Sequence, residues 1–430
     1  MGENDHQSRE WSIDIDQGNN VEEVLEPGLD CCIYRVPNIL RRINEEAYSP
    51  GFISIGPLHY GRRELLGMEK QKTRFLSKFK ERVTTEKLEE FKTYINNQEQ
   101  RIRDHYAVSS ALESSEYVAM ILNDAVFIIE LFVRNSCGPH DFLLEISQLN
   151  IFIRRDLLVL ENQIPYFVLD HLYSSAFSNK EGYPSFFVLC LNFFGAMVMF
   201  NWSFSEQPQV KHFTDLLRRA VVLEVQPTVQ SVGFICGLPC ATKLNKSGLE
   251  FKGIEGKCLH EIRLEKRKHG KWLSWFAVNE LQIPRIIISN ETECYFRNLM
   301  ALEMFHYQTQ TYICHYVDLM DHLIDTTKDV DLLIEKGIIV NCMGDIEAIT
   351  KMFNSLCSHI ALRGSLYYED AKKMKAHYKY PWNHLKATLK SVYFSNLWTG
   401  TATVAAAFLL ILTLIQTICS VKQVRNGTST

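Results

Sequence analysis

The sequence predicts a mainly α fold with a small β-rich segment (α+β), in which one large helical domain precedes a single C-terminal transmembrane helix. Three observations predict this class. Apolar residues recur at helical spacing along most of the chain. Between residues 226 and 289 this spacing gives way to short β-branched and aromatic segments, broken by Gly and Pro. Residues 391–421 carry no charged side chain, and a spanning helix needs about 20 mostly apolar residues.

The N-terminal residues 1–30 are polar and acid-rich, so we expect a disordered acidic tail. They contain neither the apolar run of a signal peptide nor the acid-poor composition of a transit peptide. The folded domain is predicted to cover 31–390 and to begin with a helical part, 31–225. Its helical patterns lie at 63–83, 86–106, 115–135, 141–161 and 210–222.

A β-containing part is predicted at 226–289 and a second helical part at 290–390. At the start of the latter, Asn290 and Glu293 have the spacing of a capping box. The basic run Arg263–Lys271 is interpreted as an exposed hairpin loop between two strands; a nuclear signal or a contact with acidic lipid are its functional alternatives. The expected strands are 231–239, 249–254, 271–278 and 284–289, and the expected helices are 290–308, 316–340 and 345–362.

Composition excludes several classes of protein. The chain is 46% hydrophobic and 22% charged, with a net charge of −4. Such a near-neutral balance argues against a general nucleic-acid binder, which is usually strongly basic. The twelve cysteines are scattered rather than arranged in a short disulfide framework. We therefore expect reduced thiols and no nucleic-acid partner.

The uncharged C-terminal run predicts a transmembrane helix at 397–420, followed by a short polar tail, 421–430. Because few residues follow the helix, we expect a tail anchor in the plasma membrane or an endomembrane, with the domain in the cytosol. The alternative is an extracellular domain, which the glycosylation triplets at Asn201, Asn245 and Asn290 would suit. Within the run, Gly400, Thr403 and Ala407 form a stripe of small residues that could support a homodimer.

The motif Glu161-Asn162-Gln163, followed by Pro165, interrupts an apolar run. Pro165 removes an amide donor and disfavours helix at the residue before it. We interpret the motif as a buried structural corner between two helices. In this interpretation Asn162 or Gln163 caps the second helix, and the other polar side chains satisfy free backbone groups.

Chemistry-bearing motifs give one metal candidate. Cys236, Cys240, Cys258 and His260 are four possible zinc ligands, although a single residue separates the last two. Buried cysteines in strands are the alternative. A phosphate-binding loop, a nucleophile elbow and a zinc-protease helix all lack their defining residues. The sequence therefore predicts no catalytic residue and no cofactor.

Seven segments, in order, resemble a plant family, the domain of unknown function 247 family of membrane-anchored proteins. They are "IYRVPNILRRINEEAYSPGFISIGPLHYG", "MEKQKTRFL", "RRDLLVLENQIPYFVL", "KHFTDLLR", "ATKLNKSGLEFK", "IPRIIISNETECYFRNLMALE" and "DLLIEKGIIVN", and the apolar tail completes the pattern. The resemblance covers residues 31–421. It implies a mainly helical protein with one C-terminal span, no known catalytic residues, and relatives implicated in self-incompatibility, growth or defence.

Three function classes follow from these observations. The first is a single-pass membrane protein whose domain serves binding, recognition or signalling, with a protein or peptide partner. The second is an enzyme with an unfamiliar site, built on the Cys/His set. The third is a membrane scaffold that self-associates through its span. The strength of the apolar run and the lack of a reaction motif favour the first.

Overall fold

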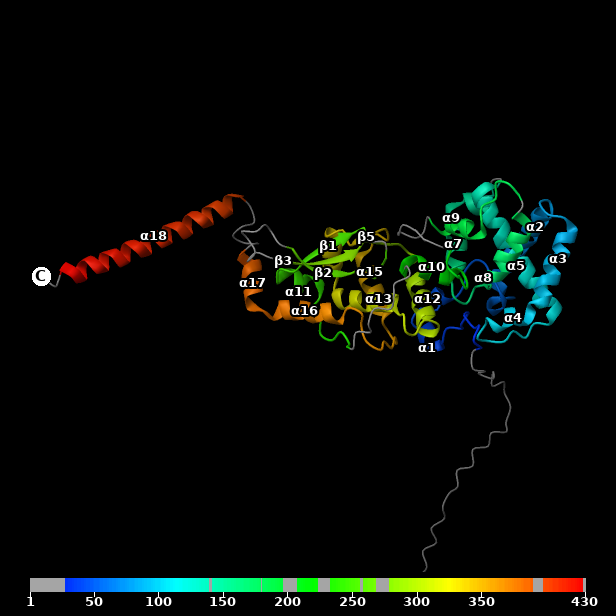
Figure 1. The fold of residues 1–430 in the computed structure, drawn as a ribbon, viewed down its shortest axis with the longest axis horizontal. Coiled ribbons are helices and arrows are strands. Elements are labelled where there is room, and N and C mark those ends of the chain that lie inside the picture. The colour runs from blue at the N-terminus through cyan, green and yellow to red at the C-terminus, as the bar shows by residue number, and fades with distance from the viewer. Residues whose placement is uncertain are drawn as a thin grey trace, which may run out of the picture.

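The computed structural model describes residues 28–138, 141–178, 180–195, 207–222, 233–255, 258–267, 278–389 and 397–427. The described part is mainly helical with two small sheets, which confirms the predicted combination of a mainly α fold with a small β component. The predicted acidic tail lies almost wholly outside the described residues. The folded part is elongated, and a long C-terminal helix leaves it at one end (Figure 1).

The N-terminal half is a helical layer built around one apolar helix, α5 (Ser114–Cys137). This helix is buried on nearly all sides, as its sequence predicts, and packs against α2, α3, α8 and α9. The other elements are α1 (Asn38–Arg41), η1 (Glu46–Tyr48), η2 (Pro57–His59), η3 (Arg63–Leu65), α2 (Leu66–Lys80), α3 (Thr85–Asn97), α4 (Glu99–Asp104), α6 (Phe142–Glu145), α7 (Ser147–Asp156), α8 (Tyr166–Phe177) and α9 (Phe186–Phe194).

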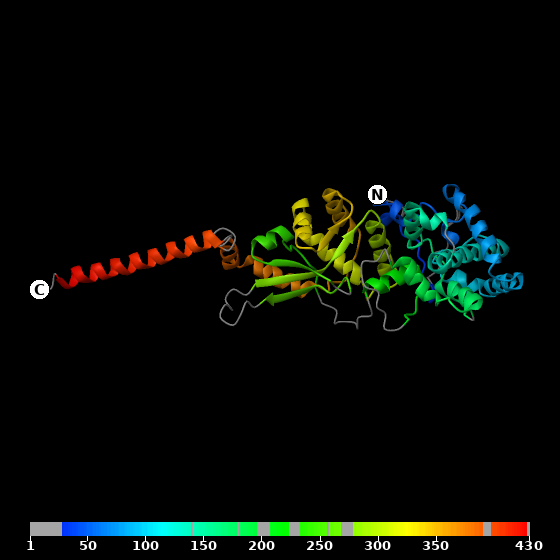
Figure 2. The same cartoon turned by 90° about the horizontal axis from the view of Figure 1, so that it is seen from above.

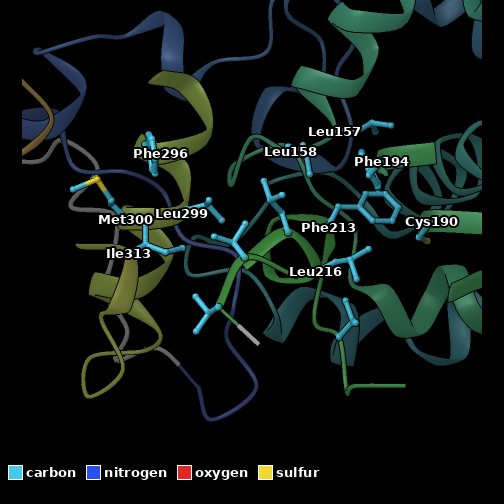
Figure 3. Packing of buried hydrophobic residues seen from close by; sticks show 14 of the residues in the cluster. Leu157, Leu158, Cys190, Phe194, Phe213, Leu216, Phe296, Leu299, Met300 and Ile313 are labelled. Carbon is cyan, nitrogen blue, oxygen red and sulfur yellow. The ribbon is translucent and has the colours of Figure 1, made fainter. Parts of the chain in front are cut away.

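Helix α10 (Phe213–Val222) joins this half to the rest of the molecule. Its side chains Phe213 and Leu216 lie between Phe194 on one side and Leu299 of α12 (Thr292–Phe305) on the other (Figure 3). All four belong to one buried apolar cluster, which extends from Cys32 to Met374. The two halves therefore share a continuous core.

The second half contains both sheets. Strands β1 (Glu250–Ile254), β3 (Val278–Pro284) and β2 (Arg263–Arg267) lie in that order, with β1 parallel and β2 antiparallel to β3. Strand β4 (Ile286–Ile288) pairs in parallel with β5 (Ile339–Asn341). The helices are α11 (Ala241–Lys246), α13 (Tyr312–Leu323), α14 (Thr327–Glu335), α15 (Ile346–Leu356), α16 (Tyr368–Lys379) and α17 (Pro381–Thr388).

Several local predictions are wrong. The first part of the basic run is strand β2 rather than a loop, because it pairs with β3; residues 268–277 lie outside the described part. Residues 233–239 contain no strand, whereas β5 forms outside the predicted β segment. Helix α12 has no side-chain cap from Asn290. Instead Glu293 accepts hydrogen bonds from Asn44 and Arg297.

Helix α18 (Leu397–Gly427) begins where the transmembrane helix is predicted and projects away from the folded part (Figure 2). In the part of the chain that the structure describes, however, no helix combines the length and the apolarity needed to cross a membrane. The longest run of described side chains in α18 is 408–422. The predicted transmembrane helix is therefore not found among the described residues.

Candidate functional site

The corner 157–165 lies between α7 and α8 and is almost completely buried. Glu161, Asn162 and Gln163 are 2%, 0% and 0% exposed. Helix α7 ends at Asp156, and α8 begins at Tyr166 directly after Pro165. The chain thus turns between two helices at the motif, and the side chains of the motif point into the protein.

The corner holds the extended segment 50–56 through side chains rather than through a strand pairing. Asp156, at the end of α7, accepts hydrogen bonds from the amides of Gly51, Phe52 and Ile53, at 3.1, 2.6 and 2.9 Å. Asn162 accepts from the amide of Ile55 at 2.7 Å. Buried backbone donors need partners, and here carboxylate and amide oxygens supply them.

Asn162 also donates from its Nδ2 to the carbonyl oxygens of Ile53 and Asp156, both at 3.0 Å. Its amide therefore serves both segments at once. Gly56 closes the contact: its φ is +71°, and a Cβ there would lie 2.5 Å from the carbonyl oxygen of Gln163. Only glycine fits this close approach.

Gln163 caps a different helix from the one that its position in the sequence indicates. Its Oε1 accepts from the amide of Phe213 at 2.9 Å, at the start of α10, and its Nε2 donates to the carbonyl oxygens of Leu157 and Val159. Helix α8 has Pro165 at its N-cap and no side-chain cap. The expectation that Asn162 or Gln163 caps α8 is therefore wrong: Gln163 binds the first amide of α10, and the first amide of α8, that of Tyr166, donates to the carbonyl oxygen of Lys211.

Glu161 lies at the centre of a buried charged cluster. Its Oε1 accepts from the amide of Val36 at 2.7 Å and from the guanidinium of Arg41, and its Oε2 lies 3.3 Å from Nε2 of His59. Burial opposes ionisation of Glu161, but the hydrogen bond from His59, the Val36 amide and the charge of Arg41 outweigh it and lower its pKa. Burial lowers the pKa of His59.

A second ion pair supports the same segment from α5. Asp124 Oδ2 accepts from the amide of Gly56 at 2.8 Å, and Oδ1 lies 2.6 Å from Nζ of Lys72. Both side chains are 1% exposed. Burial raises the pKa of Asp124 to about 6, although Lys72 and the amide favour its charged form.

A further buried network, which the sequence analysis missed, joins α10 to α12. Asp215 accepts from the hydroxyl of Tyr307 at 2.6 Å and from Nε of Arg219 at 3.0 Å. His212 is 0% exposed, and its Nε2 lies 3.1 Å from the carbonyl oxygen of Cys32. Burial lowers the pKa of His212 to about 4. The sequence gives no signal for this network, because Asp215 and Arg219 lie on the polar face of the amphipathic pattern, which is usually solvated.

Glu303 and Arg218 form an ion pair in this network, with Oε1 and Nε 3.1 Å apart and side chains 0% and 5% exposed. Burial raises the pKa of Glu303 to about 7, a value that suits a general base. Its oxygens are already engaged, however. Oε1 accepts from Arg218, and Oε2 accepts from the amides of Ile313 and Cys314 at the start of α13.

The chemical consequence is the same at both clusters. Each buried carboxylate binds backbone amides or a neighbouring cation, and each is enclosed by the core. Groups placed in this way stabilise the joints between segments, and removing one partner leaves a buried charge without compensation. The geometry assigns them to the architecture rather than to proton transfer.

The structure does not bring the four candidate zinc ligands together. Cys236 is exposed, whereas Cys240 and Cys258 are buried. Cys240 Sγ lies 3.4 Å from Oγ1 of Thr242, and the ring of His260 packs at 5.4 Å from that of Tyr312. Among the described residues, no group of three or more His, Cys, Asp or Glu side chains is placed to hold a metal ion.

A surface groove of about 270 Å³ lies between α16 and the segment 234–236. This is close to the lower limit, about 300 Å³, of typical small-molecule pockets. Lys375 donates to the carbonyl oxygen of Cys236 across it. Aromatic rings and ammonium groups together suit an anionic group with an apolar neighbour. The residues that line it are Phe234, Ile235, Cys236, Tyr368, Ala371, Lys372, Lys375, Ala376 and Lys379.

Helix α18 carries more exposed large apolar side chains than any other element in the described residues. Its large apolar side chains are between 53% and 66% exposed. Five of them are consecutive, and at about 100° per residue they surround the helix. The side chains of Gly400, Thr403 and Ala407, the predicted dimer stripe, lie outside the described part. The exposed set is Phe408, Leu409, Leu410, Ile411, Leu412, Leu414, Ile415, Ile418 and Val421.

Comparison with known proteins gives two kinds of match. A family model described as "Plant protein of unknown function" matches residues 33–412. UPF0481 protein At3g47200 of Arabidopsis thaliana is 27% identical over 433 residues, which covers 92% of this chain and 87% of that protein. Putative UPF0481 protein At3g02645, from the same plant, is 21% identical over 496 residues, with 94% and 93% covered. No solved structure matches.

Proposed function

Because the chain belongs to the domain of unknown function 247 family of plant proteins, we propose that it acts as a membrane-attached binding protein rather than as an enzyme. In this proposal α18 inserts into a lipid bilayer, and the folded part presents its surface to a protein or peptide partner. The membrane is the plasma membrane or an endomembrane.

One observation carries the proposal: the apolar side chains at 408–412 surround α18 and are exposed, on a helix that projects away from the folded part (Figure 1). Scattered exposed apolar residues are common, but a continuous apolar surface of this kind marks a contact with a membrane or a protein. The sequence on both sides of this surface, 391–421, carries no charged residue. Hydrocarbon covers an apolar helix from every side, whereas a protein partner covers one face.

The arrangement of charged groups supports binding over catalysis. In the described part, the buried carboxylates at the end of α7 and in α12 hold backbone amides, as shown for Asp156 and Glu303. The open groove beside α16 offers apolar contacts and lysines, and among its described lining residues no His, Asp or Glu accompanies the Cys236 thiol as a base.

The experiment is alkaline carbonate extraction of membranes from cells that make the full chain. Leu410→Lys with Leu414→Lys places two charges within the apolar surface. Each charge adds about 2.5–3.5 kcal/mol to the free energy of membrane insertion when it lies at the centre of a span. We expect the wild-type chain to stay in the pellet and the double variant to be released.

The matched control adds the same two charges to the exposed face of α3, by Thr93→Lys with Asn96→Lys. It is expected to pellet like the wild-type chain. Release of the wild-type chain by carbonate refutes the proposal. Retention of the Leu410→Lys, Leu414→Lys variant refutes the role of α18.

A further inference from the structure

Helix α17 is amphipathic, but its orientation is the reverse of the usual one. Trp382, Leu385 and Leu389 lie at positions i, i+3 and i+7 on one face and are 65%, 49% and 41% exposed. The helix is held to the folded part by polar atoms: Asn383 Nδ2 donates to the carbonyl oxygen of His377 at 2.9 Å, and His384 Nε2 lies 2.7 Å from that of Tyr378. A surface helix normally turns its apolar face inward.

A basic stripe on α16 ends at Lys379, just before the start of α17 in the chain. Lys372, Lys375 and Lys379 have the same i, i+3, i+7 spacing and all line the groove. Lys379 is exposed and is followed directly by Tyr380, whose ring is 55% exposed. The surface therefore combines ammonium groups with Trp and Tyr rings, the residue types that favour the headgroup region of a bilayer.

The position of α17 is tied to α18. It lies at the end of the folded part from which α18 leaves (Figure 1). Leu389 and the first residue of α18, Leu397, are eight positions apart in the sequence, so their Cα atoms are separated by roughly 30 Å at most. Once α18 is in a bilayer, α17 is confined close to the same membrane, and the short connection gives it a high effective concentration there.

We propose that α17, with the lysine stripe of α16, docks onto the surface of the bilayer that holds α18, and that this surface contains anionic lipid. Trp382, Leu385 and Leu389 enter the interface, and Lys372 and Lys379 contact the headgroups, while Lys375 holds the carbonyl oxygen of Cys236 beside them. This inference rests on the proposed membrane attachment and deepens it, because it fixes which face of the folded part turns towards the lipid.

A protein partner or a second copy of this chain could also cover the apolar face of α17. Neither accounts for the combination of the lysine stripe with the tether to α18. Charge complementarity therefore favours an anionic membrane surface.

The test uses the full chain reconstituted into vesicles of phosphatidylcholine with brominated acyl chains, which quench nearby tryptophan fluorescence. The vesicles are prepared with and without phosphatidylserine. Trp382→Phe reports on docking, and Trp398→Phe, in α18, reports on the anchor. We expect each substitution to remove part of the quenched emission. The part due to Trp382 is expected to increase with phosphatidylserine, whereas the part due to Trp398 stays constant.

A charge-matched pair of variants tests the lysines. Lys372→Gln with Lys379→Gln is expected to weaken docking on phosphatidylserine vesicles by up to about 25-fold, converted from about 1 kcal/mol per basic residue near an anionic surface. Lys80→Gln with Lys92→Gln removes the same charge from exposed positions on α2 and α3. This control is expected to leave the quenching unchanged.

The outcomes separate the two proposals. Quenching that depends on Trp398 but not on Trp382 leaves the anchor in place and overturns the docking. An absence of any quenching overturns the membrane attachment, and the docking with it. A shift in Trp382 emission that grows with protein concentration in detergent, without lipid quenching, means that another protein chain covers α17, and this also overturns the inference.

Discussion

Replacing Asn162 by alanine should destabilise the protein more than almost any other single polar substitution. The side chain makes three hydrogen bonds, with the amide of Ile55, the carbonyl of Ile53 and the carbonyl of Asp156, and it is fully buried. An unsatisfied buried polar group costs about 1–3 kcal/mol. We therefore expect Asn162→Ala to lower the free energy of unfolding by about 3–5 kcal/mol. The loss is at the lower end of this range if water enters the space left by the amide and binds the groups that Asn162 held.

Urea unfolding of the full chain in mild detergent, followed by circular dichroism, measures this loss. The matched control is Asn192→Ala on α9, because Asn192 is exposed and makes one long hydrogen bond to Ser136. It should change the free energy of unfolding by less than about 0.5 kcal/mol. A loss below about 1 kcal/mol for Asn162→Ala would refute the reasoning, since the segment 50–56 would then be held by something other than the corner.

Two further predictions concern the network between α10 and α12. The pKa of His212 is about 4 in the folded protein and about 6.5 when unfolded. Between these two pH values the unfolded chain binds more protons than the folded protein. The free energy of unfolding should therefore decrease as the pH falls from 6.5 to 4, and His212 should contribute up to about 3 kcal/mol to this decrease. His212→Asn should flatten the measured pH dependence in this window; an unchanged slope would contradict the burial of an uncharged ring. Arg218→Met leaves Glu303 buried without its partner and should cost about 3–5 kcal/mol in urea unfolding. Lys373→Met, which breaks the exposed pair with Asp370, should lower the free energy of unfolding by less than about 1 kcal/mol. Equal losses for Arg218→Met and Lys373→Met would contradict the inference that burial makes the Arg218–Glu303 pair costly to break.

Local patterns in the sequence predict the helices well. The apolar run of α5 and the amphipathic spacing of α2 each depend on neighbours three or four residues away, so the pattern is complete within the segment. Strands are harder, because their partners are distant. Strand β2 contains a run of charged residues that indicates a loop, and it forms a strand only because β3 lies beside it.

The candidate sites show the same limit. That Glu161, Asn162 and Gln163 serve backbone groups rather than chemistry is an interpretation that the spacing alone suggests. Their partners could not be predicted, since Val36 and Phe213 are far from the motif in the sequence. The capping of α10 by Gln163 instead of α8 is a result of tertiary packing that no local pattern contains.

The lysine stripe on α16 and the outward-facing apolar side of α17 can be predicted only in part from the sequence. The spacing of Lys372, Lys375 and Lys379 is visible in the sequence, but a basic face is usually only solvated. The contacts of Asn383 and His384 with the backbone of α16 reveal that the apolar face of α17 points outward.

The central claim, that lipid surrounds α18, is tested most directly by protease treatment of sealed vesicles that contain the full chain, followed by mass spectrometry of the peptides left in the membrane. We predict that a peptide containing residues 408–418 survives digestion, while peptides from the exposed face of α3 are lost. Digestion of residues 408–418 as complete as that of α3, with the vesicles intact, would contradict the claim.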